Sequence, residues 1–252
     1  MIKVSNLDFG YFDTEVFKGF SIEVEEGETV ALLGPNGSGK TTLIKILSKV
    51  LAPKGGSVLI ENRDINSYSY AELSKFVASV PQIHRPTFEY TVFDVVLAGR
   101  NPHLTSIAPS KKDEEIVLSI LEELHIYNLA DRPYTDISGG ELRLVLIARA
   151  LAQEAKIILL DEPTAFLDFK NKNLILNKVL ELREKKNITF IITLHDPNEA
   201  IQVADRVLLL KKGEVVALGK TNDVLTPENL KYVYDIDVEK VTYDGKVFIF
   251  AK

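Results

Sequence analysis

The distribution of apolar and polar positions divides the chain into three parts. In residues 1–82, apolar residues form short runs that alternate with polar residues or lie between turn residues, which is typical of β-strands. These predicted strands span residues 2–7, 17–24, 29–33, 57–60 and 76–81. A helical pattern over residues 41–51 stops before Pro53, and a short helix is predicted over residues 71–76.

Helical periodicity replaces the strand pattern over residues 83–148. Ser110 and Asp113 have the spacing of a capping box, which marks the start of a helix. The apolar residues that follow recur at intervals that place them on one helix face; they are Ile116, Ile120, Leu121 and Leu124. We interpret residues 83–148 as a helical insertion.

The third part returns to strands that alternate with helices. Apolar strands are predicted at residues 157–160 and 188–193, with a helix over residues 171–186 between them. Repeated strand–helix units indicate a parallel α/β sheet. Near the end, residues 241–243 and 246–250 flank Asp244-Gly245, a pair that favours a hairpin with a type I′ turn.

Composition narrows the class of protein. The chain has 252 residues, of which 46% are hydrophobic, so a large core can form. A net charge of −6 gives no support for nucleic-acid binding, and the absence of cysteine excludes disulfides and thiolate metal sites. No apolar run approaches the roughly 18 residues that span a bilayer. We therefore expect a soluble, cytosolic protein that reaches a membrane only through a partner.

Residues 34–41 read Gly-Pro-Asn-Gly-Ser-Gly-Lys-Thr and fit the phosphate-binding pattern G-x-x-x-x-G-K-[ST]. A predicted strand precedes the loop and a predicted helix follows it, as the pattern requires. The glycines let backbone N–H groups point at phosphates, and the helix dipole adds positive potential. Lys40 can reach the β- and γ-phosphates, and the Thr41 hydroxyl can ligate Mg²⁺. The candidate nucleotide-binding residues here are Gly34, Pro35, Asn36, Gly37, Ser38, Gly39, Lys40, Thr41 and Thr42.

Two carboxylates follow the apolar strand at residues 157–160. Asp161 can hold Mg²⁺ near the phosphate loop, and Glu162 can accept a proton from an attacking water. An acidic strand end without the loop is more often plain surface. With the loop in the same chain, the pair predicts a phosphate-transfer site that uses ATP and Mg²⁺.

Ser138-Gly139-Gly140-Glu141 allows two interpretations. Ser138 and Glu141 fit a capping box, so an ordinary helix start explains them. Gly139 and Gly140 also leave backbone N–H groups bare at a positive helix end, which suits a second anion site. Sequence spacing alone does not place this segment near Lys40.

Taken in order, these motifs make the chain resemble the ATP-binding-cassette (ABC) ATPases over essentially its whole length. The Leu-Ser-Gly-Gly-Gln-type signature of that family matches residues 137–141, where Glu141 replaces Gln, and Arg143 and Arg149 also fit. The resemblance implies a single α/β P-loop NTPase domain over residues 1–252, with a mostly parallel core sheet and an N-terminal antiparallel β part. Residues 1–82 and 149–252 would form the RecA-like core, and residues 83–148 a helical subdomain that carries the signature.

The resemblance also implies roles for individual residues. Tyr11 would stack on adenine, although a strand-end tyrosine is the plainer interpretation. Gln82 would contact Mg²⁺ and the γ-phosphate, so that Thr41, Gln82 and Asp161 form the metal set. Glu162, His195 and Gln82 would be the catalytic set.

A second copy of the chain is the first partner that the resemblance implies. Two copies would pair head to tail around two ATP molecules. The opposite site would then be completed by Ser138, Gly139, Gly140 and Asp168.

Three segments resemble the ATPases of iron–siderophore, haem and cobalamin importers in particular. They are residues 98–103, residues 193–200 and the ending from Thr226 onward. This subfamily implies a polytopic membrane permease as partner, a substrate-binding protein acting indirectly, no nucleic acid, and a cytoplasmic location on the inner face of the membrane. The alternative is a soluble ABC ATPase without a transport role, such as one in iron–sulfur cluster assembly.

Overall fold

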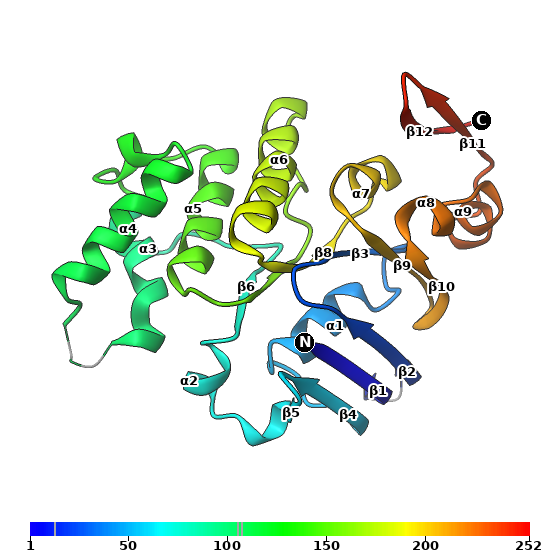
Figure 1. Ribbon diagram of the computed structural model, residues 1–252, viewed down its shortest axis with the longest axis horizontal. Coiled ribbons are helices and arrows are strands. Elements are labelled where there is room, and N and C mark those ends of the chain that lie inside the picture. The colour runs from blue at the N-terminus through cyan, green and yellow to red at the C-terminus, as the bar shows by residue number, and fades with distance from the viewer. Residues whose placement is uncertain (13, 105, 107) are drawn as a thin grey trace.

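A six-stranded sheet forms the centre of the molecule (Figure 1). The computed structural model describes residues 1–12, 14–104, 106 and 108–252. Within them the sheet order is β10 (Glu214–Lys220), β9 (Arg206–Lys211), β3 (Thr29–Leu33), β8 (Thr189–Thr193), β7 (Ile157–Leu160) and β6 (Val77–Val80). Strands β9 to β6 pair in parallel, and β10 pairs with β9 antiparallel.

An antiparallel sheet lies beside the central one. Its order is β2 (Thr14–Val24), β1 (Ile2–Tyr11), β4 (Gly55–Ile60) and β5 (Arg63–Asp64). The chain ends in a separate hairpin of β11 (Val238–Tyr243) and β12 (Lys246–Ala251). Its turn residues Asp244 and Gly245 have φ values of 49° and 72°. A type I′ turn requires a positive φ at both central residues, so these values agree with the predicted turn.

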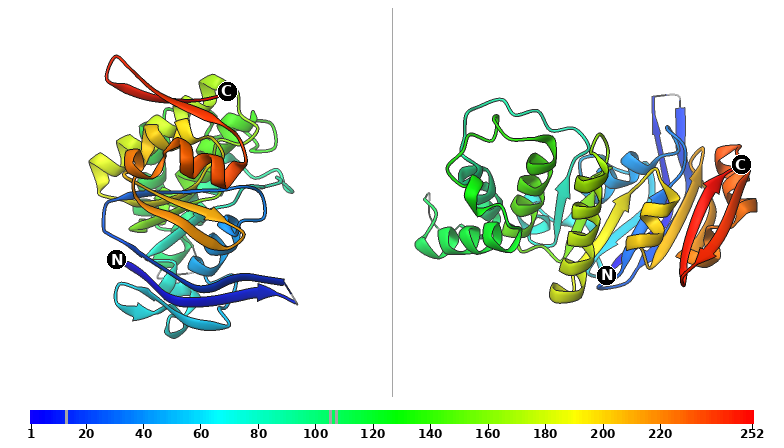
Figure 2. Two further views of the ribbon diagram at one scale, coloured as in Figure 1. Left: turned by 90° about the vertical axis from the view of Figure 1, so that its right-hand side faces the viewer. Right: turned by 90° about the horizontal axis from the view of Figure 1, so that it is seen from above.

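The helices fall into groups along the chain. The first group contains α1 (Lys40–Leu47), η1 (Ile65–Ser67) and α2 (Tyr70–Leu73). The second contains α3 (Val92–Leu97), η2 (Ala98–His103), α4 (Lys111–Glu123), η3 (Tyr127–Leu129) and α5 (Gly139–Ala152). The third contains α6 (Phe169–Lys186), α7 (Pro197–Val203), α8 (Thr221–Val224) and α9 (Pro227–Tyr234). Helices α3, α4 and α5 gather at one end of the long axis, opposite the C-terminal hairpin (Figures 1 and 2).

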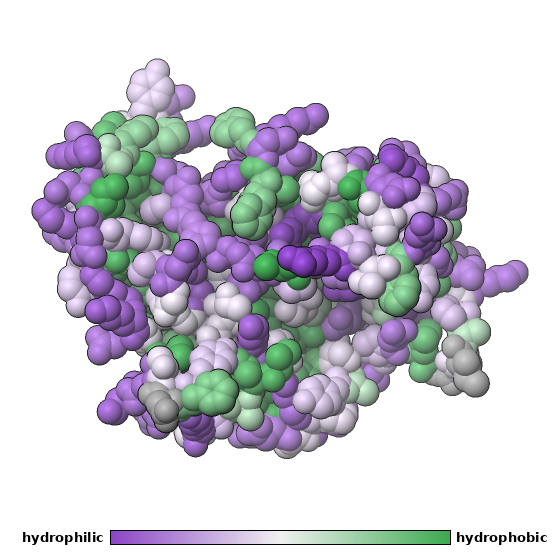
Figure 3. Space-filling model, turned by 180° about the vertical axis from the view of Figure 1, so that it is seen from behind, coloured by the Kyte–Doolittle hydropathy of each residue, from purple (hydrophilic) through white to green (hydrophobic). Residues whose placement is uncertain are grey.

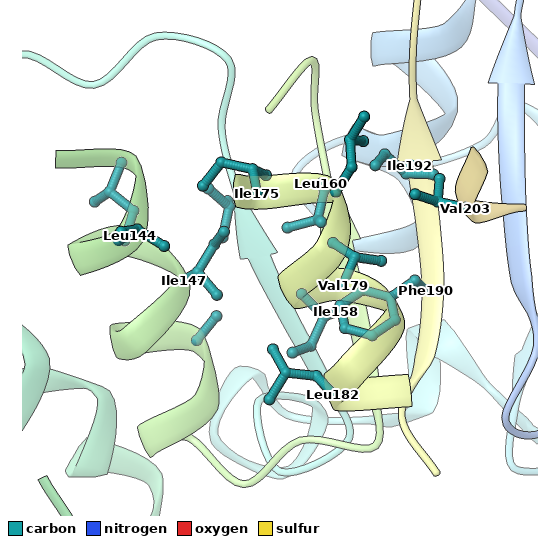
Figure 4. Close-up of a cluster of buried hydrophobic side chains, with 14 of the residues drawn as sticks. Leu144, Ile147, Ile158, Leu160, Ile175, Val179, Leu182, Phe190, Ile192 and Val203 are labelled. Atoms are coloured by element: carbon teal, nitrogen blue, oxygen red, sulfur yellow. The ribbon is translucent and has the colours of Figure 1, made fainter. Parts of the chain in front are cut away.

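Strand β3 separates two hydrophobic cores. Ala31 and Leu33 face the core under the helices, whereas Val30 and Leu32 face the core that contains α1 and the antiparallel sheet. Both faces of the strand are covered, which is why its sequence is a continuous apolar run. Leu144 and Ile147 of α5 extend the first core toward Ile175 and Val179 of α6, above β7 (Figure 4).

Several predicted boundaries differ from the structure. Strands 29–33 and 157–160 match β3 and β7, but the helix predicted over 41–51 ends at Leu47. Lys49 has φ 59°, and the N–H groups of Lys49 and Val50 donate to Ile46 and Lys45. This pair of bonds is a Schellman ending, which terminates the helix before Pro53 is reached.

The capping box at Ser110 and Asp113 is confirmed at the start of α4. The short helix predicted over residues 71–76 is instead Tyr70–Leu73. The division of the chain at residue 148 stays a prediction, and it falls inside α5.

The C-terminal hairpin is held against α7 by one amide side chain. Asn198 Oδ1 accepts from the Ile249 N–H at 2.8 Å, and Asn198 Nδ2 donates to the Ile249 carbonyl at 3.0 Å. A cavity of about 870 Å³ remains between the hairpin, α6 and α7. Figure 3 shows it from behind as a hollow in the surface.

Candidate functional site

Parallel pairing brings four loops to one edge of the central sheet. Leu32 of β3 is in register with Thr193 of β8, and Leu160 of β7 with Val80 of β6. The segments after β3, β6, β7 and β8 therefore meet at the carboxyl ends of these strands. They line a cavity of about 760 Å³. Its lining comprises Tyr11, Val16, Asn36, Gly37, Ser38, Gly39, Lys40, Thr41, Thr42, Gln82, Glu162, Ala165, Phe166 and His195.

The loop between β3 and α1 is a tight cradle. Gly39 has φ 106°, and a Cβ there would come within 2.7 Å of the Phe17 ring. A side chain at this position is therefore excluded by both backbone conformation and space. Lys40 folds back over the loop and donates to the Gly34 carbonyl at 2.7 Å and the Pro35 carbonyl at 3.1 Å. Burial lowers the pKa of Lys40 below its usual value, while the Glu162 and Asp161 carboxylates act in the opposite direction.

A buried hydroxyl in the same loop tests whether a phosphate chain fits. Ser38 Oγ is buried, and it has no hydrogen-bond partner among the described residues. A buried polar atom is normally paired, so an unpaired one in a loop of glycines suits a bound oxyanion. Together with Lys40 and the N-terminus of α1, the loop fits the triphosphate of a nucleotide.

Asp161 accepts hydrogen bonds from two threonines. Thr41 Oγ1 donates to Asp161 Oδ1 at 3.1 Å, and Thr193 Oγ1 donates to the same oxygen at 2.8 Å. The hydroxyl of Thr41 and the carboxylate of Asp161 are hard oxygen ligands in direct contact, which is the donor chemistry that Mg²⁺ prefers. Thr193 was not among the residues predicted from sequence. The only sign of Thr193 in the sequence was a hydroxyl residue at the end of an apolar strand.

Two partners hold the Glu162 carboxylate. Gln82 Nε2 donates to Glu162 Oε2, and His195 Nε2 lies 2.6 Å from Glu162 Oε1. Glu162 has φ 45°, a left-handed conformation that costs on the order of 1 kcal/mol or more for a non-glycine residue. Its N–H donates to Thr193 Oγ1 at 2.7 Å, which supports this conformation. Three residues predicted to act together thus lie in contact.

Tyr11 lines the same cavity. It is 40% exposed, its ring packs edge-on against Phe9, and its Oη is 3.4 Å from Thr42 Oγ1. The exposed ring next to the phosphate loop is available for stacking on a flat base. The adenine-stacking role predicted for Tyr11 stays a proposal. Val16, Ala165 and Phe166 line the cavity but were missed by sequence reasoning, because apolar residues carry no local signal of ligand contact.

The signature residues do not line this cavity in the described part of the chain. Ser138 caps α5: its Oγ accepts from the Glu141 N–H at 3.3 Å, and Glu141 Oε2 accepts from the Ser138 N–H at 2.8 Å. The Ser138 side chain and backbone N–H lower the pKa of Glu141. Glu141 therefore serves the capping box, which explains how it replaces Gln. Nothing lies within 4 Å of a Cβ added at Gly139, so that backbone is open.

Asp168 also lies outside the cavity lining. It caps α6, where its Oδ1 accepts from the Asn171 N–H at 2.8 Å. A Cβ added at Gly140 would meet the Asn171 side chain at 2.6 Å, so Asp168 and the signature approach each other through Asn171. Within one chain, Lys40 lines the cavity and Ser138 does not.

Comparison with known proteins identifies the family. The ABC transporter family matches residues 17–165. An uncharacterised ABC transporter ATP-binding protein of Methanocaldococcus jannaschii is 41% identical, over 94% of this chain and 92% of its own. The molybdate import ATP-binding protein of Haemophilus influenzae is 35% identical, over 93% and 88%. The petrobactin import ATP-binding protein of Bacillus anthracis is 33% identical, over 100% and 93%.

Solved structures agree with this result. One is an inward-facing conformation of a metal-chelate type ABC transporter, with TM-score 0.87 and 33% identity, covering 100% of this chain and 96% of that one. Another is a dimeric ATP-binding cassette in a post-hydrolysis state bound to ADP and phosphate. It has TM-score 0.78 and 29% identity, and covers 88% and 99% of the two chains. Among the described residues, no helix has both the length and the apolar character needed to cross a bilayer.

Proposed function

The chain belongs to the ABC transporter family, and on that premise we propose that it is the ATP-hydrolysing subunit of an importer of iron(III) chelates. The observation that carries the hydrolytic part is the convergence of Gln82 and His195 on the Glu162 carboxylate, beside the phosphate loop. Iron–siderophore complexes and haem are the iron chelates that the sequence resemblance suggests, and cobalamin, a cobalt chelate, is the alternative from the same subfamily.

In this proposal the nucleotide triphosphate occupies the cavity beside the loop. Lys40 exchanges the carbonyls of Gly34 and Pro35 for β- and γ-phosphate oxygens. Thr41 and Asp161, with the amide oxygen of Gln82, would hold Mg²⁺, and the ion would supply charge neutralisation on the phosphates. Tyr11 stacks on the adenine.

Glu162 is the proposed general base. It accepts a proton from the water that attacks the γ-phosphorus, and the bond to the β-phosphate oxygen breaks, so that ADP and phosphate are the products. His195 Nε2 lies 2.6 Å from Glu162 Oε1, and it orients this carboxylate. In the structure, Gln82 and His195 both contact the Glu162 carboxylate. When ATP and the attacking water bind, these contacts have to be replaced by contacts to the water and the γ-phosphate.

A second copy of the chain is required to complete the site. We expect Ser138 and the open backbone of Gly139 to bind an anion at this helix end, which is not part of the cavity lining of its own chain. Two copies arranged head to tail would present this helix end to the γ-phosphate bound by the other copy's Lys40, with Asp168 at the contact. A similar cassette that is dimeric with ADP and phosphate bound supports the pairing of two copies.

The segment after Gln82 is the proposed permease contact. Ile83, Phe88 and Tyr90 are exposed there, and the rings of Phe88 and Tyr90 are 5.9 Å apart. Exposed apolar side chains in one short segment suit an apolar helix of a partner. Through it the chain would lie on the inner face of the membrane, with a substrate-binding protein on the far side.

The test is to co-express the chain with candidate permeases, reconstitute the complex in liposomes, and measure uptake driven by ATP. We expect uptake of a ferric chelate and little uptake of molybdate. The petrobactin and molybdate relatives are both similar to this chain, so both substrates belong in the assay. Molybdate uptake alone would reject the chelate, and ATP hydrolysis without any permease binding would favour a soluble assembly ATPase.

A further inference from the structure

We propose that Arg143 is a positioning residue that ties the signature helix α5 to Gln82 and thereby sets the hydrogen bonding of Glu162. Arg143 lies five residues after Ser138 in α5, and it is 8% exposed. Its Nη1 donates to the Pro81 carbonyl at 2.8 Å, and its Nη2 donates to the Gln82 carbonyl at 2.9 Å. This inference rests on the proposed ATP hydrolysis at this site and extends it.

The geometry suits arginine in particular. One guanidinium grips two successive carbonyl oxygens, which a single ammonium group does not do with the same fixed geometry. Burial lowers the pKa of Arg143, and the Asp161 carboxylate acts in the opposite direction. Burial of a guanidinium costs free energy, and the two hydrogen bonds to backbone carbonyls offset part of that cost. These hydrogen bonds fix the backbone of residues 81 and 82, and thereby the position from which the Gln82 side chain extends.

Arg143 connects the two functional ends of the site. Ser138 and Arg143 are separated by roughly 7–8 Å of rigid helix at about 1.5 Å per residue. On the far side of Arg143, the Gln82 side chain donates to Glu162, which also contacts His195. A shift of α5, such as one produced when Ser138 meets an anion, is therefore carried to the base through Arg143 and then Gln82.

His84 continues the segment that Arg143 binds. The centroid of its ring lies 5.8 Å from that of the Tyr134 ring. Its Nε2 is buried and has no hydrogen-bond partner among the described residues. Arg143 donates to the carbonyls of residues 81 and 82, and the buried Nε2 of His84 extends this seated segment by two residues.

A double-mutant cycle on the purified chain tests the inference. Arg143→Lys keeps the charge but loses the two-carbonyl grip, and we expect kcat to fall about 10- to 100-fold with the KM for ATP within about twofold. Gln82→Ala should lower kcat to a similar extent. In the Gln82→Ala background Arg143→Lys should have no further effect, because the group that it positions is gone. Arg183→Lys on α6 is the matched control, because Arg183 pairs with Asp205 and neither residue lines the cavity, and it should leave kcat unchanged in both backgrounds.

Independent, multiplying losses in the double variant would overturn the inference while leaving the proposed function intact. A KM that rises with kcat unchanged would overturn it too. If Arg143→Lys fails to fold, as judged by its thermal unfolding midpoint, Arg143→Gln enters the same cycle with the same expectation. A wild-type chain without ATP hydrolysis would reject the proposed function itself, and the role of Arg143 with it.

Discussion

Thr193 bridges the two acidic residues of the site: its Oγ1 donates to Asp161 at 2.8 Å and accepts from the Glu162 N–H at 2.7 Å. The neighbouring strand β8 thus fixes both the candidate metal ligand and the candidate base. Thr193→Val should lower the free energy of unfolding by about 1–3 kcal/mol, because it leaves a buried N–H and carboxylate short of a partner. Thermal and urea unfolding measure this effect.

Thr29 provides a matched control for that substitution. Its Oγ1 is also buried at a strand position, but it has no hydrogen-bond partner among the described residues. Thr29→Val should therefore leave the free energy of unfolding unchanged or raise it. Equal losses in the two variants would show that the bridge of Thr193 contributes nothing specific.

Glu162→Gln should keep ATP binding and lose most turnover. A positioned general base contributes roughly 10²–10⁴-fold, and the amide accepts no proton from water. The variant should also accumulate as an ATP-bound dimer, visible by gel filtration. Hydrolysis at a near-wild-type rate would remove Glu162 from the role of base.

Ser138→Arg should block dimer closure, because a bulky cation would replace the hydroxyl at the open helix end. ATP binding to the single chain through Lys40 should survive, as Ser138 and Lys40 belong to separate parts of one chain. Mixing this variant with Lys40→Ala chains should restore some hydrolysis, since one composite site in a mixed dimer is intact. Loss of ATP affinity in the isolated Ser138→Arg chain would contradict a site shared between copies.

Gln82→Ala should reduce transport more than it reduces ATP hydrolysis. Gln82 contacts Glu162 on one side and begins the exposed segment with Ile83 and Phe88 on the other. Chelate uptake per ATP consumed in liposomes is the measurement, with Glu89→Gln in the same segment as control. A ratio equal to that of the wild type would show that Gln82 does not couple the two processes.

Asp113 should make the helical part of the molecule sensitive to acid. The Ser110 hydroxyl and N–H, then Arg100, lower its pKa to about 2. A carboxyl with a lowered pKa stabilises the fold above its unfolded pKa of about 3.9 and loses that contribution as pH falls toward 2. The thermal midpoint of Asp113→Asn should therefore lie below that of the wild type at pH 6 and converge with it near pH 2. A constant gap across this range would exclude the carboxylate as the cause.

The sequence alone determined the features whose chemistry is local. Residues 34–41 predicted a phosphate loop because a glycine-rich turn, a lysine and a hydroxyl act within a few residues of each other. Strand β3 and the capping boxes at Ser110 and Ser138 were predictable for the same reason. The end of α1 was not, because Lys49 adopts a left-handed conformation without the glycine that usually signals it.

Only the tertiary structure decided which distant side chains meet. Thr193 reaches Asp161 because β7 and β8 pair in one register, and Arg143 reaches Pro81 because α5 packs beside the segment after β6. Partners 32 and 62 residues apart leave no trace in local spacing. The structure also leaves Ser138 out of the cavity that Lys40 lines, and we propose that the two residues meet only between two chains. The physical reason is that strand register and helix packing come from the whole core, whereas motifs come from neighbouring residues.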